Sequence, residues 1–279
     1  MVDIIWANNQ LMTVGDSGHI FTSLDGIAWT SRRQHVLENY LFGVRASGSL
    51  YVTVGSDGVI LTSPDGAAWT KRTSGTTARL SHVLWNGKEL MAPGSDGSMY
   101  QSLDGITWNK RPTGGTYVLT ATAWTGSRWV AVAASFGNAF YSDDGIKWTY
   151  CDPKASDDLE AVIWTGKQLV AVGQMGGVVV SVDGSTWARK RAFVQGGLYG
   201  VAWTGSKLIA AGSGGRILTA DHNPISIRPY AARKWNDKTG PKVASRMDAA
   251  WFGPGDGASK GAVFTVLGTS VAAPASHLP

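Results

Sequence analysis

Carboxylates recur at a regular spacing along this chain of 279 residues, and they are the side chains best suited to chemistry. Glycoside hydrolysis needs paired carboxylates, and calcium binding needs several oxygen ligands that converge on one point. An isolated Asp-Gly pair supplies neither arrangement. We therefore expect the recurring aspartates to be structural, each accepting hydrogen bonds from backbone N–H groups of its own turn. They follow one another at steps of 39 or 40 residues: Asp25, Asp65, Asp104, Asp144 and Asp183.

Each of these aspartates belongs to the same short motif, Ser-x-Asp-Gly-x-x-Trp. The five strings are SLDGIAW, SPDGAAW, SLDGITW, SDDGIKW and SVDGSTW. Asp-Gly is a strong hairpin signal, because glycine supplies the positive φ that a tight turn needs. The tryptophan that follows would cover an apolar layer of the sheet. The motif therefore indicates a turn between two strands rather than a reactive site.

The elements that position this turn are clearest between residues 159 and 187. Apolar, β-branched runs at 159–164, 168–172 and 178–181 are separated by turns at Gly166 and at 173–177, and a fourth run begins at Trp187. Four strands in a period of about forty residues are typical of a β-propeller blade. A single sheet of this size cannot bury both of its faces, so copies of the blade must pack on one another.

Six copies are visible, and the sequence predicts an all-β fold: a six-bladed β-propeller of four-stranded antiparallel blades, with a short C-terminal extension. The expected blades lie near residues 1–39, 40–78, 79–117, 118–157, 158–196 and 197–230. Residues 231–279 fall outside the repeat, and 247–251 and 261–268 could each be a strand. This extension could be a damaged seventh blade, a strand that closes the ring or an arm that docks on a neighbouring subunit. We favour the docking arm.

The motif strings resemble the Asp-box repeat of bacterial neuraminidase-like propellers, which reads S-x-D-x-G-x-T-W between the third and fourth strands. The version here is one residue shorter, as in many bacterial and phage-encoded relatives. The resemblance covers residues 1 to about 220 and implies the fold rather than the activity, because the motif lies on a turn. Sialidases of that fold need three arginines, a Tyr–Glu nucleophile pair, an acid/base Asp and an F/Y-R-I-P string. The chain lacks the string, and Arg45 and Arg128 have no evident partners at the central face.

Candidate ligand-binding residues lie on the opposite face from the Asp-Gly turns. Loops between the second and third strands of each blade share that face with the links between blades. Aromatic rings beside hydrogen-bonding groups suit sugar recognition, although such loops can simply be polar. Three aspartates on this face could converge across the axis. The candidates are Asp16, Asp57, Asp96, Tyr40, Tyr117, Tyr150 and Phe136.

Other groups that could do chemistry are few. The three glutamates, Glu38, Glu89 and Glu160, belong to different repeats, and the five histidines show no spacing typical of metal ligands. His82 and Glu160 fall on innermost strands and could point into the central channel. We expect no catalytic residue, no metal and no cofactor. The single cysteine, Cys151, excludes a disulfide framework and a cysteine-rich zinc site.

The composition suits an all-β repeat protein, with 36 glycines, 13 tryptophans and 16% charged residues. A net charge of +5 is below what a dedicated nucleic-acid binder usually carries, so we expect no nucleic-acid partner. Basic residues follow the motif tryptophan at 32–33, 71–72, 110–111 and 189–191. Protection of an exposed edge strand is the favoured interpretation, and a basic ring that faces a phosphate-bearing surface is the alternative. No signal peptide and no membrane insertion are expected.

These observations favour a non-enzymatic binding or structural module. The leading hypothesis is a bacteriophage virion protein, associated with the tail or capsid, that engages a host surface glycan or another virion protein within a larger oligomeric assembly. It would be made in the host cytoplasm without a signal peptide. One alternative is a divergent glycosidase that depends on Asp57 or Asp96. The other is an assembly factor for an intracellular complex, which would place the protein in the cytoplasm.

Overall fold

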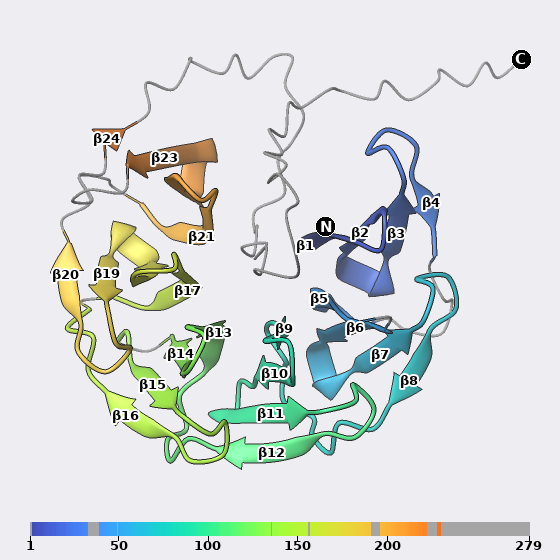
Figure 1. Cartoon of the computed structure of the whole chain (residues 1–279), viewed down its shortest axis with the longest axis horizontal. Coiled ribbons are helices and arrows are strands. Elements are labelled where there is room, and N and C mark those ends of the chain that lie inside the picture. The colour runs from blue at the N-terminus through green and yellow to red at the C-terminus, as the bar shows by residue number, and fades with distance from the viewer. Residues whose placement is uncertain are drawn as a thin grey trace, which may run out of the picture.

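The computed structural model describes residues 2–32, 39–48, 50–134, 136–155, 157–190, 196–221 and 228–229, and the extension at 231–279 lies outside them. The described residues form six four-stranded antiparallel sheets, arranged one after another around a common axis (Figure 1). The prediction of a six-bladed propeller is thereby confirmed. Within the described part of the chain, the helices are four three-residue 3-10 turns, and none could cross a membrane.

Each blade consists of four strands in chain order, from the axis outward. Blades one to three contain β1 (Asp3–Ala7), β2 (Gln10–Val14), β3 (Ile20–Ser23) and β4 (Thr30–Ser31); β5 (Leu41–Ser47), β6 (Leu50–Gly55), β7 (Ile60–Ser63) and β8 (Thr70–Arg72); β9 (Leu84–Trp85), β10 (Leu90–Pro93), β11 (Ser98–Ser102) and β12 (Asn109–Pro112). Blades four to six contain β13 (Leu119–Trp124), β14 (Trp129–Ala133), β15 (Ala139–Ser142) and β16 (Thr149–Cys151); β17 (Leu159–Trp164), β18 (Leu169–Gly173), β19 (Val178–Ser181) and β20 (Ala188–Lys190); β21 (Leu198–Trp203), β22 (Lys207–Gly212), β23 (Arg216–Asp221) and β24 (Arg228–Pro229).

The middle strands are apolar on both faces because a neighbouring blade covers each face. In blade five, every residue of β18 and of β19 is buried. Buried side chains form five core clusters, and each cluster joins two consecutive blades. In one of them, Trp187 of blade five packs with Val130 and Val132 of blade four. The motif tryptophan therefore packs against the preceding blade.

Two faces of the propeller carry different connections. The loops between second and third strands contact the links between blades: Leu41 N–H donates to the Gly15 carbonyl at 3.0 Å, and Ser56 N–H donates to the Tyr40 carbonyl at 2.8 Å. We call this side the loop face. The opposite side carries the Asp-Gly turns and the turns between first and second strands, and we call it the turn face. There Gln10, beside the first turn of blade one, donates from Nε2 to the Asp65 carbonyl of blade two at 3.2 Å.

Candidate functional site

On the turn face, the carboxylate of each Asp-Gly turn is occupied by its own turn. In blade five, Oδ1 of Asp183 accepts the backbone N–H groups of Ser185 and Thr186 at 2.9 and 2.8 Å, and the Ser181 hydroxyl at 3.0 Å. Partial burial alone would raise the pKa of Asp183, but these hydrogen bonds lower it to about 2. Hydrogen bonds from the turn lower the pKa in the other four copies as well: Asp25, Asp65, Asp104 and Asp144.

The glycine and tryptophan of the motif complete the turn. Trp187 donates from Nε1 to the Gly184 carbonyl at 3.1 Å, which holds the indole over the turn. Gly184 has φ +76°, and a Cβ there would lie 2.6 Å from a methyl carbon of Val130 in blade four. Glycine is required for both reasons, since the backbone is left-handed and the neighbouring blade is in contact. The Asp-Gly turns of the turn face therefore pack each blade against the one before it.

The loop face has a different regularity. In five blades, the loop between the second and third strands carries two successive residues at positive φ, of which the second is glycine. A bulky side chain is rare in this conformation because its Cβ crowds the backbone. Phe136 and Met175 nevertheless occupy it, with φ of 63° and 55° and exposed fractions of 84% and 70%. The first residues of the five pairs are Ser17, Asp57, Phe136, Met175 and Gly214.

One aspartate hydrogen-bonds to the backbone of both loops that carry these side chains. Asp158, in the link between blades four and five, accepts the backbone N–H of Phe136 on Oδ1 at 3.1 Å. Its backbone carbonyl accepts the N–H of Gln174, the residue before Met175, at 2.9 Å. Gln174 in turn donates from Nε2 to Oε1 of Glu160 at 2.8 Å. We call these five residues the Phe136–Met175 patch; it combines two exposed apolar groups with two carboxylates and an amide.

Three of the predicted ligand-binding aromatic residues belong to blade four or its links. Tyr117 and Tyr150 both pack against the buried ring of Phe140, at centroid distances of 6.1 and 5.7 Å, and the Tyr150 hydroxyl donates to Asn138 at 3.1 Å. Phe136 lies in the loop just before the strand of Phe140. The fourth aromatic residue is elsewhere, because Tyr40 stacks on Phe42 at the link into blade two, at 6.3 Å.

Two of the three predicted aspartates share one groove, and the third lies elsewhere. Asp57 and Asp96 line an open groove of about 1050 Å³ beside blades two and three, and Asp16 is not among its lining residues. Oδ2 of Asp57 accepts a hydrogen bond from Nδ2 of Asn39 at 2.9 Å. Partial burial alone would raise the pKa of Asp96, but Lys110 at 2.8 Å and the Tyr100 hydroxyl at 2.9 Å hold it below its usual value. Asp96 is therefore engaged in local contacts.

A buried polar chain near the axis links the first three blades. Arg45 pairs with Asp3 at 2.8 Å and approaches Nε2 of His82 at 2.9 Å. Burial and the charge of Arg45 lower the pKa of His82 well below 6.5, so its ring is neutral. Burial raises the pKa of Asp3. Arg45 and the backbone N–H groups of Val44 and Ile4 lower this pKa, but the effect of burial is larger. This chain of polar groups was not predicted from the sequence, although a charged residue inside an apolar first strand is a signal for it.

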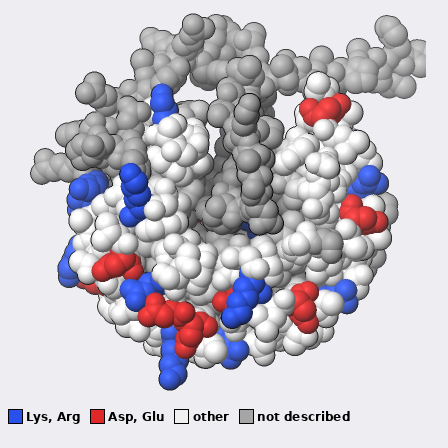
Figure 2. Space-filling model, viewed as in Figure 1, with Lys and Arg blue, Asp and Glu red and all other residues white. Residues whose placement is uncertain are grey.

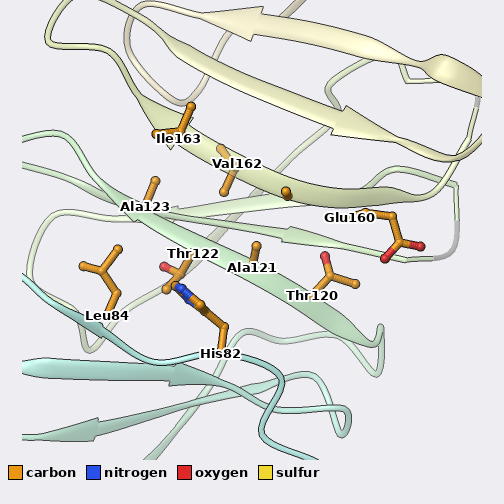
Figure 3. A pocket seen from close by; sticks show the side chains of 10 residues that line it. His82, Leu84, Thr120, Ala121, Thr122, Ala123, Glu160, Val162 and Ile163 are labelled. Carbon is orange, nitrogen blue, oxygen red and sulfur yellow. The ribbon is translucent and has the colours of Figure 1, made fainter. Parts of the chain in front are cut away.

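His82 and Glu160 were expected to point into the central channel, and both line one small cavity of about 20 Å³, together with β13 and β17 (Figure 3). That volume is comparable to a single water molecule. A sugar ring or a peptide side chain is much larger, so this cavity is too small to be a ligand site. His82 is buried, whereas Glu160 is partly exposed and belongs to the Phe136–Met175 patch.

The arginines also have partners. Arg45 and Arg128 were expected to lack the companion arginines that a sialidase site needs at the central face. Arg45 pairs with Asp3 and His82 as described above. Arg128 binds both carboxylate oxygens of Asp143, at 2.6 and 3.1 Å, and its guanidinium lies 4.5 Å from the ring centre of Tyr141. Neither arginine resembles a site for a substrate carboxylate.

Among the basic residues that follow the motif tryptophan, those at 71–72, 110–111 and 189–190 lie on outer strands and Arg32 directly follows β4, while residues 33 and 191 lie outside the described part of the chain. Arg32 and Arg72 donate from Nε to threonine hydroxyls of the adjacent third strand, at 3.0 and 2.8 Å. Figure 2 shows basic and acidic side chains interspersed on the visible face, not gathered into a field of one sign. Among the described residues, no three His, Cys, Asp or Glu side chains are grouped so that they could hold a metal ion.

No family model matches the chain, and no curated protein matches it. Solved structures do. YCF48 bound to D1 peptide aligns with a TM-score of 0.66 at 18% identity, over 82% of this chain and 81% of that one. YCF48 from Cyanidioschyzon merolae aligns at 0.65 and 19%, over 82% and 84%. Virginiamycin B lyase from Staphylococcus aureus aligns at 0.74 and 7%, over 82% and 83%. Similarity at these identities shows the fold, a β-propeller consistent with a binding or structural module.

Proposed function

We propose that this chain is a non-enzymatic binding module that holds a short stretch of a partner protein against the Phe136–Met175 patch. The observation that carries the proposal is the pair of bulky apolar side chains, Phe136 and Met175, exposed at positive φ on adjacent blades. Both side chains contribute little buried area, and their backbone conformation is unfavourable. Contact with a partner would bury these apolar side chains, which the chain by itself leaves exposed.

The chemistry of the patch favours one kind of partner segment. The Asp158 carboxylate bonds the Phe136 backbone, the Glu160 carboxylate bonds Gln174 next to Met175, and Gln174 offers an amide. A peptide with one bulky apolar residue next to a lysine or arginine would match both properties. The structure of YCF48 bound to D1 peptide supports the idea that a propeller of this shape can hold a peptide.

A peptide-display experiment tests this proposal. The purified chain would be screened against a random peptide library, together with the double variant Phe136→Ser/Met175→Ser. Val182→Ser is the matched control, because Val182 is also an exposed apolar residue of blade five but lies on the turn face. We expect the chain and the control to select peptides that combine an apolar and a basic residue, and the double variant to lose them. Equal binding by the double variant would refute the proposal.

A glycan ligand is the second candidate, and the exposed rings of Tyr40 and Tyr150 favour it. Flat rings stack on the C–H faces of sugars, as the sequence analysis anticipated. A glycan array probed with the chain, with reducing-end release assayed in the same samples, tests this candidate. Binding without release supports a lectin-like role. Release that Asp57→Asn or Asp96→Asn abolishes would establish the glycosidase alternative and overturn the non-enzymatic proposal.

The setting of this binding module is also a proposal. The Ser-Asp-Gly-Trp hydrogen bonds support membership of the Asp-box propellers in their short form. Within that group, a virion protein that contacts a host glycan or another virion protein stays our leading prediction, and an assembly factor in the cytoplasm stays the alternative. Mass spectrometry of purified particles and of the soluble fraction of the producing cells separates them. Absence of the chain from particles would remove the virion hypothesis.

A further inference from the structure

The described part of the ring is open on one side. Figure 1 shows β21 and β23 of blade six on one side of the opening and β1 and β3 of blade one on the other. The five core clusters join blades one to two, two to three, three to four, four to five and five to six. Among the described residues, none of these clusters joins blade six to blade one.

In blades two to six, one face of the sheet packs against the preceding blade. The corresponding face of blade one is exposed. Ile4 occupies the place of Val44 in blade two, and Trp29 occupies the place of Trp69. Val44 and Trp69 are 0% and 6% exposed, whereas Ile4 and Trp29 are 38% and 37% exposed. Trp6, at the end of the first strand, is exposed as well. The apolar residues of an inter-blade core are thus present on blade one without the blade that would cover them.

The Asp-Gly turn of blade one leads to the same conclusion. A Cβ on Gly66 of blade two would meet Met12 of blade one at 2.6 Å, so this turn is fitted tightly to its predecessor. A Cβ on Gly26, the equivalent glycine of blade one, would meet only Leu11 of the same blade, at 3.3 Å. Blade one therefore carries the full docking motif, with no preceding blade among the described residues to receive it.

Blade six has the complementary open face. Ile217 takes the place that Val178 occupies in blade five, and their exposed fractions are 54% and 0%. Ile209 takes the place of the fully buried Val170 and is only partly buried. Two apolar sheet faces thus lie on the two sides of the same opening, and each matches a face that is buried elsewhere in the ring.

The chain beyond blade six is long enough to fill this opening. Residues 231–279 number 49, against steps of 39 or 40 between the repeats. The string MDAAW at 247–251 ends on tryptophan, as do four of the six first strands, and in β1 Trp6 is the last residue but one. The string AVFTVLG at 262–268 ends on glycine, as the second strand QLVAVG does at 168–173. These are the patterns of the two inner strands of a blade, in the correct order.

We propose that residues 247–268 fill the opening as the two inner strands of a seventh unit and close the ring between blades six and one. Their apolar residues cover Ile4, Trp6 and Trp29 on one side and Ile217 on the other. Residues 230–246 connect Pro229 to this unit, and about 3.3 Å per extended residue gives the connection ample reach. This places the extension within its own ring, in place of the arm on a neighbouring subunit that the sequence analysis favoured.

Hydrogen exchange of the full-length chain, followed by mass spectrometry, tests the proposal directly. We expect amides in 247–251 and 263–267 to be protected to the same degree as those of β21 and β22, because strand hydrogen bonds shield them. Exchange as fast as in an unfolded peptide would refute the proposal. The molar mass from light scattering is measured in the same buffer. A mass twice the 29.5 kDa of one chain would also refute it, by assigning the segment to a second copy.

A charge placed on the covered face gives an independent test in the full-length chain. We expect Ile4→Asp to lower the urea midpoint and to abolish protection of 247–268, because a carboxylate would be buried against the seventh unit. Leu103→Asp is the control, since Leu103 is 66% exposed on the turn face of blade three, and it should change neither quantity. Unchanged protection and an unchanged midpoint in Ile4→Asp would refute the proposal. The exchange pattern of the unmodified chain decides the question if Ile4→Asp does not fold.

Discussion

The turn face and the loop face of this propeller use the same repeat for different purposes. On the turn face, the serine hydroxyl donates to the aspartate in all five Ser-x-Asp-Gly-x-x-Trp turns. The tryptophan donates to the glycine carbonyl in four of them, and Trp148 of blade four is the exception. On the loop face, the backbone is also repeated, with successive residues at positive φ, but the side chain at the first position changes from blade to blade. Repetition of side chains indicates a structural role, and variation on a repeated backbone indicates where recognition can differ.

The difference has a physical cause. A turn that docks on the preceding blade must keep its small glycine and its buried tryptophan, because both contact the neighbour at close range. A loop that faces solvent has no such contact to satisfy. Its side chain is free to be serine, aspartate, phenylalanine or methionine, subject only to the cost of a left-handed backbone. Substitutions on the turn face should therefore affect mainly stability, and substitutions on the loop face should affect mainly binding.

The largest effect is expected from the tryptophan of a docked turn. Trp69→Ala should lower the free energy of unfolding by about 3–5 kcal/mol, because it leaves a cavity in the core shared by blades one and two. Urea unfolding followed by far-ultraviolet circular dichroism measures this loss. Phe136→Ala on the loop face is the comparison variant and should change stability by less than about 0.5 kcal/mol. A similar loss in both variants would show that the two faces contribute equally to stability.

The second-largest effect is expected from acid, which protonates the aspartates of the turn face and so lowers stability. The five turn aspartates have lowered pKa values, about 2 for Asp183, so they stabilise the fold above their unfolded value of 3.8. That stabilisation is lost as the pH falls from about 4 towards 2. His82, held neutral in the fold, adds an earlier loss that begins below 6.5. Urea midpoints between pH 2 and 7 should show both steps, and His82→Asn should remove only the earlier one.

A smaller loss is expected from the serine of the motif. Ser181 is buried, accepts the Gly184 N–H at 2.8 Å and donates to Asp183. Ser181→Ala should cost about 1–2 kcal/mol, because the Gly184 N–H loses its partner. Ser206→Ala, at an exposed turn of blade six, is the control and should leave the melting temperature unchanged. No difference between the two variants would show that the motif hydrogen bonds contribute little.

The smallest change in stability is expected on the loop face. Phe136→Gly relieves a left-handed phenylalanine, and the greater freedom of glycine in the unfolded chain partly offsets this gain. The free energy of unfolding should stay the same or rise by about 0.5 kcal/mol. Peptide binding, measured by titration calorimetry with a peptide selected on the unmodified chain, should be lost. Destabilisation together with retained binding would reverse the roles that we assign to the two faces.

Much of the fold could be predicted from local patterns. The Asp-Gly steps, the branched runs and the turn glycines at positions such as Gly184 gave six four-stranded blades, and the structure has them. The candidate site was harder to predict. Phe136 was chosen as an aromatic loop residue, but Met175 was not chosen, because a methionine in a loop carries no sequence signal of its own. Its positive φ and its position beside Asp158 exist only in the folded chain.

The sequence by itself determined the repeat, the blade and the turn, because these depend on residues fewer than forty positions apart. Only the tertiary structure decided which side chains from different blades meet. Asp3, Arg45 and His82 are separated by about one repeat each and become neighbours because first strands lie side by side around the axis. The same stacking leaves Ile4, Trp29 and Ile217 without cover among the described residues. Burial depends on which blade comes next, and local sequence periodicity does not contain that information.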